Sequence, residues 1–315
     1  MKHFKRLALC AVAAACAATL IAAAGCTQAS ESYTPPEATP QVSKPTIITD
    51  GTLTVGVNAS NAPLAGQPSS SSKIVGIDVD MAAALADQLG LKVKVVDVGS
   101  DAASALSQSK ADVVMGVNKS DATSTFWTSD SYLDTSVALF ALSSNSAVPT
   151  NSATTKIAVQ VSSNSAWAVT NEFDSATITT TDDLKSAFSA LQSGQVSYVA
   201  ADAVSGTYVA RNAGVDVHVV SLLQSASGYS VGVLDGNTKL KQAVSSALST
   251  LNNNGVADLI QKKWLGVSLD LSGFAAPADS TSNGETSEIS ASQDAINAAY
   301  LGTGLSSDSS SSQAA

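Results

Sequence analysis

ALSQSKADVVMGVNKS, residues 105–120, has the same plan as ALQSGQVSYVAADAVS, residues 190–205. Each segment contains the end of a helical pattern, a short polar turn, and an apolar run that leads into a polar loop. Because strands that alternate with helices at this spacing form parallel sheets covered by helices, the plan is typical of an α/β fold. Its occurrence in both halves of the chain predicts two similar α/β lobes, each a mostly parallel sheet flanked by helices.

Further strands and helices are predicted around the first of these segments. TLTVGV, residues 52–57, is typical of a buried strand, and GIDVDMAAALADQLG, residues 76–90, is typical of an amphipathic helix. We expect Asp78 to be the N-cap of this helix, because an Asp side chain accepts hydrogen bonds from the first backbone N–H groups. The apolar face of the helix is formed by Met81, Leu85 and Leu89.

The apolar runs of the two repeated segments end in equivalent polar positions. Gly-Val-Asn follows the first run at residues 116–118, and Ala-Asp-Ala follows the second at residues 201–203. In open parallel sheets, ligands bind beyond the carboxyl ends of the strands. If the two lobes face each other, these ends define a cleft, and Asn118 and Asp202 are candidate binding residues.

The first 26 residues have the pattern of an export leader. Basic residues at the start are followed by an apolar run over 7–24 and then by Ala-Gly-Cys. This ending resembles the lipobox of bacterial lipoproteins, which implies that a signal peptide of residues 1–25 is removed and that Cys26 receives lipid. The protein would then be anchored at the outer face of the cytoplasmic membrane. A transmembrane helix is the alternative, since about 18 apolar residues can just span a bilayer.

Cysteine usage and charge are consistent with an exported binding protein. Cys10 and Cys16 lie in the leader, so Cys26 would be the only cysteine after cleavage, and no internal disulfide is expected. The chain has 16 basic and 26 acidic residues, a net charge of −10. Removal of the three basic leader residues leaves 13 basic residues and a net charge of −13. An acidic chain of this kind argues against nucleic acid as a partner.

Composition changes along the chain predict the domain boundaries. Ser, Thr, Pro and Glu dominate the segment after the leader, and Ser, Ala, Gly and Asp dominate the C-terminal end, so neither can bury a core. The predicted parts are the signal peptide 1–25, a disordered tether 26–46, lobe 1 over 47–141 with 229–271, lobe 2 over 142–228, and a disordered tail 272–315.

The order and spacing of several segments resemble the family 3 extracellular solute-binding proteins, the amino-acid receptors of ABC importers. The resemblance covers about residues 47–267. The segments that carry it are LTVGVNASNAPLAG (53–66), GIDVDMAAALADQLG (76–90), ADVVMGVNKSDATST (111–125), SDSYL (129–133), VQVSSNSA (159–166), ALQSGQVSYVAAD (190–202) and KKWLG (262–266). The family implies a type II periplasmic-binding-protein-like fold, with strands near 137–142 and 229–234 crossing between the lobes as a hinge. It also implies that the lobes close over a small polar solute and present it to an ABC permease.

The resemblance implies roles for four polar residues. Asp202 stands where the family has an Asp that accepts hydrogen bonds from a ligand ammonium group, although it would also suit the N-cap of a helix over 203–212. Ser163 matches a Thr or Ser at a helix N-terminus that binds an anion such as a carboxylate, with plain capping as the alternative. Ser120 matches a Thr that lines the pocket, and Asn118 lies on the same loop; ordinary turn chemistry is the alternative for both.

The chain departs from the family at three further positions. Thr123 occupies the place of an Arg that binds the α-carboxylate of the ligand, and the neighbouring Lys119 supplies a positive charge without a planar bidentate fork. Asn61 and Leu64 occupy places where the family has aromatic rings that pack on the ligand. These departures argue against a standard amino-acid site. The solute is expected to be a small polar compound, either an amino acid or amine-like.

Three hypotheses about function follow. The first is a lipid-anchored, monomeric binding protein that delivers a small polar solute to an ABC importer and uses no cofactor and no metal. The second is a degenerate sensor or structural surface lipoprotein without a tightly bound ligand. The third is a dehydratase-type enzyme on the same fold; against it, Glu172 is the only Glu in the predicted folded body and is expected at the surface, late in a helix. We expect no enzymatic activity.

Overall fold

The computed structural model describes residues 39–119, 125–143, 147–149, 155–173 and 177–274. Several sequence predictions concern other residues and stay predictions. They are the signal peptide, the lipid attachment at Cys26, the roles of Ser120 and Thr123, and the disorder of the tail beyond residue 274. No helix of the described residues is both long and apolar enough to cross a membrane.

The first sheet has six strands in the order β4-β1-β5-β13-β6, with β7 also paired to β13. β4 (Lys92–Asp97), β1 (Thr52–Val57) and β5 (Val113–Asn118) are parallel, and Val55 is paired with both Val95 and Val113. β13 (Ser227–Leu234), β6 (Phe126–Thr128) and β7 (Leu133–Thr135) add antiparallel pairs. The parallel part of this sheet is the part that the βαβ spacing predicted.

The second sheet has five strands in the order β10-β9-β11-β8-β12. β10 (Thr177–Thr181), β9 (Lys156–Gln160) and β11 (Tyr198–Asp202) are parallel. β8 (Val137–Leu142) is antiparallel to both β11 and β12 (Val217–Leu222). A short hairpin of β2 (Ser60–Asn61) and β3 (Ala65–Gly66) lies outside both sheets.

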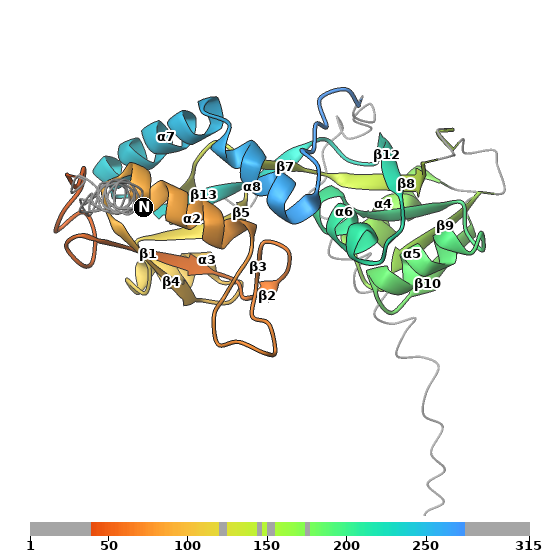
Figure 1. Ribbon diagram of the computed structural model, residues 1–315, viewed down its shortest axis with the longest axis horizontal. Helices are drawn as coiled ribbons and strands as arrows, with labels where there is room; N and C mark the ends of the chain where they lie inside the picture. Colours follow the sequence, from red (N-terminus) through yellow and green to blue (C-terminus); the bar gives the residue numbers. More distant parts are fainter. Residues whose placement is uncertain (1–38, 120–124, 144–146, 150–154, 174–176, 275–315) are drawn as a thin grey trace, which may run out of the picture. The chain divides into compact units, whose positions relative to one another are not determined.

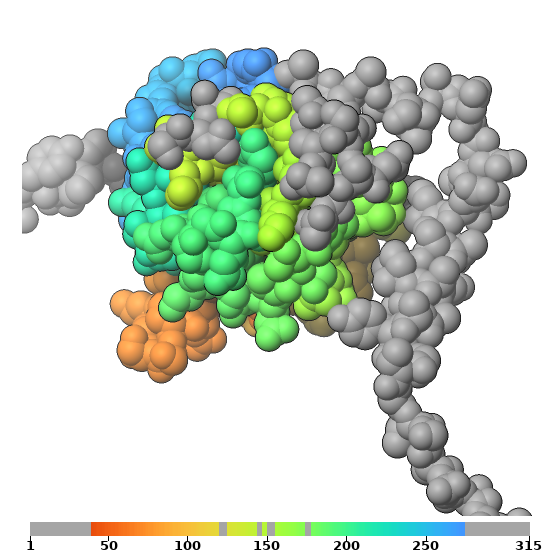
Figure 2. All heavy atoms as spheres, turned by 90° about the vertical axis from the view of Figure 1, so that its right-hand side faces the viewer, coloured from red at the N-terminus to blue at the C-terminus, as the bar shows by residue number. Residues whose placement is uncertain are grey.

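Helices cover both sheets, as Figure 1 shows. α2 (Ile77–Gln88), α3 (Ala102–Ser107), α7 (Thr238–Asn253) and α8 (Val256–Leu265) belong to the first sheet. α4 (Asn164–Glu172), α5 (Leu184–Gln192) and α6 (Ala203–Asn212) belong to the second, and Figure 2 shows the face of the molecule on which these segments, coloured green, are exposed. Each sheet has its own buried apolar core, so the chain forms two α/β lobes.

The chain passes between the two sheets twice. The first passage is at Ser136, between β7 and β8, and the second is at residues 223–226, between β12 and β13. The Ser136 hydroxyl donates a hydrogen bond to the Gln224 carbonyl at 2.7 Å, which ties the two passages together. Residues 137–141, which the sequence analysis put in lobe 1, thus lie in the second sheet, because β8 pairs with β11 and β12.

α2 has the predicted apolar face but a different first turn. Met81, Leu85 and Leu89 are buried as expected. The helix begins after Gly76, where an added Cβ would overlap the Leu64 carbonyl, so that glycine fits a close approach of two backbone segments. The expectation that Asp78 is the N-cap is wrong. Asp78 lies inside the first turn, 2% exposed, and its carboxylate accepts a hydrogen bond from a distant tyrosine instead.

Candidate functional site

A cavity of about 320 Å³ lies where the two passages meet the ends of strands and helices. We call it the first cavity. Its walls include the end of β11 at Asp202, the N-terminus of α4 at Ser163, both passages, and residues of the first sheet at Asn118 and Tyr229. Polar side chains thus converge on it from both sheets.

A second cavity of about 420 Å³ lies beside the first sheet. Its lining includes Asn61 of the β2–β3 hairpin, Asp101 at the start of α3, and Gly116 near the end of β5. Asn118 and Tyr229 line this cavity as well as the first. The two cavities are therefore neighbours, and Asn118 and Tyr229 form the wall that they share.

Asp202 is held at the end of β11 by two hydrogen bonds. Its Oδ1 accepts from the backbone N–H of Ser205 at 2.8 Å, and its Oδ2 accepts from the hydroxyl of Thr135 at 2.5 Å. The side chain is half-buried and lines the first cavity. The two alternatives of the sequence analysis are therefore compatible, because Asp202 caps α6 while it borders the cavity. An ionised carboxylate has about four acceptor positions, so these bonds leave capacity for a ligand donor.

Ser163 is the N-cap of α4. Its Oγ accepts from the backbone N–H of Ala166 at 3.2 Å and donates to the Gln160 carbonyl at 2.7 Å. Ser163, Asn164 and Ser165 all line the first cavity. The N-terminus of α4 thus presents backbone N–H groups and a partial positive charge to the same space as Asp202.

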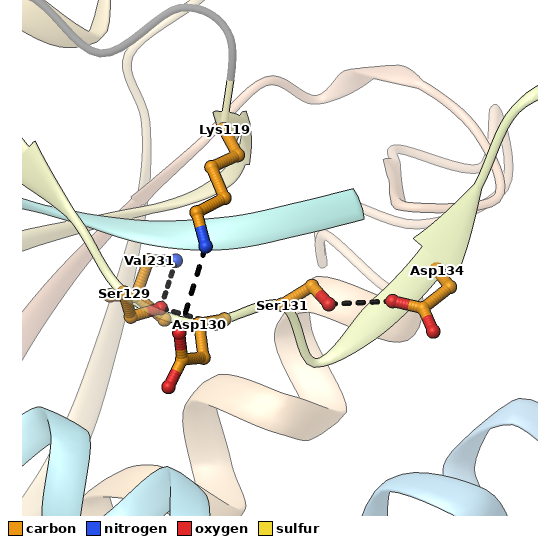
Figure 3. Close-up of polar contacts among 6 residues, drawn as sticks. All are labelled: Lys119, Ser129, Asp130, Ser131, Asp134 and Val231. Carbon is orange, nitrogen blue, oxygen red and sulfur yellow. Dashed lines mark hydrogen bonds and ion pairs between the residues drawn. The ribbon is translucent and has the colours of Figure 1, made fainter. Parts of the chain in front are cut away.

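The remaining predicted site residues have different surroundings. Asn118 and Asn61 line cavities, as described. The ammonium group of Lys119 lies 3.7 Å from a carboxylate oxygen of Asp130, and the side chains are 62% and 97% exposed (Figure 3). Lys119 lines neither cavity. Leu64 is 2% exposed, packs in the core of the first lobe and lines neither cavity.

Several residues that line the first cavity were not predicted from the sequence, and four of them lie at or near the passages between the sheets. They are Thr135, Ser136, Gln224 and Tyr229, and all line the first cavity. Thr135, Ser136 and Gln224 lie in or next to the passages, and Tyr229 lies near the start of β13. The alternation of apolar and polar residues in a strand does not predict which residues of such a passage line a pocket. The run SDSYLDTS before β8 offered only the weak signal of several adjacent hydroxyl residues.

A buried hydrogen-bond network adjoins the second cavity. The hydroxyl of Tyr132 donates to Asp78 Oδ1 at 2.5 Å and accepts from the backbone N–H of Gly116 at 2.9 Å. Burial raises the pKa of Asp78 to about 7, and the hydrogen bond from Tyr132 opposes this shift. Burial and the Asp78 charge also raise the pKa of Tyr132 well above its ordinary value. Gly116 itself lines the second cavity, so the network fixes part of the cavity wall.

The described residues that line the cavities provide polar groups suited to binding. Among the described residues, no three His, Cys, Asp or Glu side chains are clustered as metal ligands would be. Glu172 is exposed at the end of α4 and lines neither cavity. The aromatic rings of Trp127 and Trp167 line neither cavity. Trp127 packs against the first core, and Trp167 is 48% exposed on α4.

Comparison with known proteins agrees with the two-lobed α/β fold. The sequence profile of the bacterial extracellular solute-binding proteins, family 3, matches residues 53–267. Among solved structures, the chain is similar to an ancestral cationic amino acid solute-binding protein, with 26% identity and a TM-score of 0.59. The similar region covers 68% of this chain and 96% of that one. No curated protein matches the chain.

Two more distant structures support the fold alone. The L-cystine solute receptor of Neisseria gonorrhoeae, in its unliganded open conformation, is 21% identical with a TM-score of 0.61, over 70% of this chain and 95% of that one. A polar amino acid ABC uptake transporter substrate-binding protein from Streptococcus thermophilus is 19% identical with a TM-score of 0.63, over 70% of this chain and 89% of that one.

Proposed function

The chain belongs to family 3 of the bacterial extracellular solute-binding proteins, and we propose that it captures a small polar solute bearing an ammonium group between its two lobes. The solute would be an amino acid or an amine-like compound. The protein would hand it to an ABC permease of the cytoplasmic membrane, act as a monomer, and catalyse no reaction.

The observation that carries the proposal is the position of Asp202. Its carboxylate is fixed by Ser205 and Thr135 and borders a polar cavity at the passages between the sheets. A carboxylate held in this way is pre-organised to accept a charge-assisted hydrogen bond from an ammonium donor. Asn118 and Tyr229 would contact the solute from the first lobe, and the N-terminus of α4, at Ser163, from the second.

The two passages give a physical route for closure. A ligand that contacts both lobes favours the arrangement in which both sets of contacts form at once. The passages at Ser136 and at residues 223–226 are short and hydrogen-bonded to each other, which suits a hinge. Attachment to the membrane would come from lipid on Cys26, which would hold the lobes near the permease at the outer face of the cytoplasmic membrane.

Thermal unfolding with a panel of solutes tests the proposal. A ligand that binds only the native protein stabilises it by mass action, so we expect amino acids or amines in the panel to raise the melting temperature. Organic acids, sugars and short peptides complete the panel. Asp202→Ala should abolish the shift that an ammonium ligand produces, and an unchanged shift would remove Asp202 from the site.

Two other outcomes would replace the proposal. If no solute raises the melting temperature, the protein is better explained as a sensor or structural lipoprotein without a tight ligand. If the protein converts a cyclic hydroxy acid into a dehydrated product, the dehydratase hypothesis is favoured. Isolation of the protein from cell envelopes together with a permease would support the transport role.

A further inference from the structure

The charges around the two cavities differ from what an α-amino acid requires. Of the described residues that line them, the charged ones are Asp202 in the first cavity and Asp101 in the second. No Lys, Arg or His of the described chain is among the lining residues. In either cavity, a ligand α-carboxylate would therefore meet one Asp carboxylate and no cationic side chain of the described residues.

Outside the cavity linings, the described ranges place no substitute for such a cation beside the cavities. Lys119, the basic residue nearest in sequence to the shared wall, pairs with Asp130 at the surface. The segments 120–124, 144–146, 150–154 and 174–176, which the structure does not describe, read SDATS, SNS, TNSAT and DSA and contain no basic residue. Among the described residues, the positive features beside the first cavity are helix N-termini. Those of α5 and α6 are capped by Asp183 and Asp202, so only that of α4 has no acidic cap.

Two contributions bear on whether the site prefers an amine or an amino acid: the dipole of a helix N-terminus and a hydrogen bond to a charged group. A helix N-terminus stabilises an anion by roughly 0.3–1 kcal/mol at an exposed site, a factor of about two to five. A hydrogen bond to a charged partner is worth about 1.5–3 kcal/mol, a factor of about ten to a hundred. A backbone N–H of α4 can give a ligand carboxylate a charged hydrogen bond of the same kind as Asp202 gives an ammonium group. In the first cavity, however, the charge of Asp202 attracts the ammonium group and repels the carboxylate, and no cationic side chain of the described residues offsets that repulsion.

We infer, on the basis of the proposed function, that the preferred solute is an organic amine without a carboxylate group. Asp202 would accept a hydrogen bond from its ammonium group in the first cavity. The ring of Tyr229, which lines both cavities, suits contact with a cation or with the methylene groups of the amine. Asp101 would attract a second ammonium group in a diamine that reaches the second cavity.

Matched pairs of ligands that differ by one carboxylate test the inference. We would measure the affinity of the full-length protein for cadaverine and lysine, putrescine and ornithine, and agmatine and arginine by isothermal titration calorimetry at pH 7. The inference predicts that at least one amine binds about tenfold or more tightly than its amino acid. It also predicts that amine binding weakens as salt is added, because the attraction is electrostatic.

Substitution of Asp202 shows which charge is responsible. Asp202→Asn keeps a good helix N-cap while it removes the charge, so the fold is expected to persist. Amine affinity should fall about ten- to a hundredfold, and the preference for the amine over its amino acid should decrease. Asp183→Asn is the matched control, because Asp183 caps α5 through Ser186 and lines neither cavity. This control should bind amines as the unaltered protein does.

The possible failures are distinguishable. If an amino acid binds as tightly as its amine or more tightly, the inference is overturned while the proposed function stands. If no amine or amino acid binds to protein that is folded, as shown by a cooperative thermal transition, both the inference and the proposed function fail. If amines bind equally to Asp202→Asn and to the unaltered protein, the assignment of the ammonium group to Asp202 is overturned.

Discussion

The hydroxyl of Tyr132 donates a 2.5 Å hydrogen bond to the carboxylate of Asp78, and both side chains are buried. The two residues are 54 positions apart in the sequence. The same hydroxyl accepts from the backbone N–H of Gly116, which lines the second cavity. Tyr132 directly precedes β7, the strand that leads into the first passage. The network therefore joins the wall of the second cavity to that strand.

Tyr132→Phe should destabilise the protein by about 1–3 kcal/mol, because it leaves a buried carboxyl group and a backbone N–H without their partner. Chemical denaturation at pH 7 would measure the change in the free energy of unfolding. Tyr208→Phe is a suitable control, since the half-buried Tyr208 packs against the same core and its hydroxyl makes no hydrogen bond to any other described residue. Equal effects of the two substitutions would contradict a specific role for the Tyr132 hydroxyl.

The raised pKa of Asp78 predicts a pH dependence of stability. With a pKa of about 7 in the folded protein and 3.8 in the unfolded chain, the folded state binds the proton more tightly. The stability that Asp78 contributes is thus complete below about pH 4 and is lost progressively as the pH rises to about 7. At higher pH the carboxyl group is ionised in both states, and its contribution no longer changes.

Asp78→Asn removes this titration while it keeps an acceptor for Tyr132. One pKa unit corresponds to about 1.4 kcal/mol, so between pH 5 and pH 8 the variant should gain about 2.6 kcal/mol relative to the unaltered protein. Denaturation of both proteins at several pH values would measure the difference. Asp112, whose pKa burial also raises, is present in both proteins, so its contribution cancels. A constant difference across this range would show that Asp78 does not titrate there.

Local pattern predicted much of the fold. The period of Met81, Leu85 and Leu89 gave α2 its buried face, and the βαβ spacing gave the parallel strands of each sheet. Partners distant in the sequence decided the rest. Asp78 had the sequence surroundings of an N-cap but bonds to Tyr132, and β8 had the pattern of any buried strand but pairs within the second sheet.

The same distinction holds for the candidate site. Asp202 was predicted to be at the site because it ends a strand and matches a family residue, and Ser163 because it matches a family residue at a helix N-terminus; both line the first cavity. Leu64 was placed there by resemblance alone, yet its apolar side chain is buried in the first core. Tyr229 and Thr135 reach the cavity only because the chain passes between two sheets, which no local pattern of either residue encodes.

Ser163→Ala should lower both stability and ligand affinity. The loss of an N-cap costs about 1 kcal/mol of folding stability. The loss of ligand affinity is a separate effect, because it depends on contact with the ligand and not on capping. Thermal unfolding and titration with the best ligand of the panel would measure them. Asn237→Ala is the control, because Asn237 caps α7 and lines neither cavity. Equal ligand affinity of the two variants would limit Ser163 to capping.

Gly116→Ala tests the close contact between the cavity wall and Asp78. Gly116 has φ +73°, and an added Cβ would lie 2.5 Å from Asp78 Oδ2. Gly99 also lines the second cavity and has φ +66°, but its added Cβ would meet nothing within 4 Å. Both substitutions therefore pay the cost of a left-handed conformation, about 1–2 kcal/mol, and only Gly116→Ala adds a steric overlap.

We expect Gly116→Ala to be at least about 1 kcal/mol more destabilising than Gly99→Ala, since overlap in a well-packed region typically costs 1–3 kcal/mol. Chemical denaturation of both variants would give the difference. Combination of Gly116→Ala with Asp78→Ala should recover part of it, because the shorter side chain removes the oxygen that the new methyl group meets. If the two glycine variants lose the same stability, backbone conformation alone explains the cost, and the contact between Gly116 and Asp78 does not hold this wall of the second cavity in place.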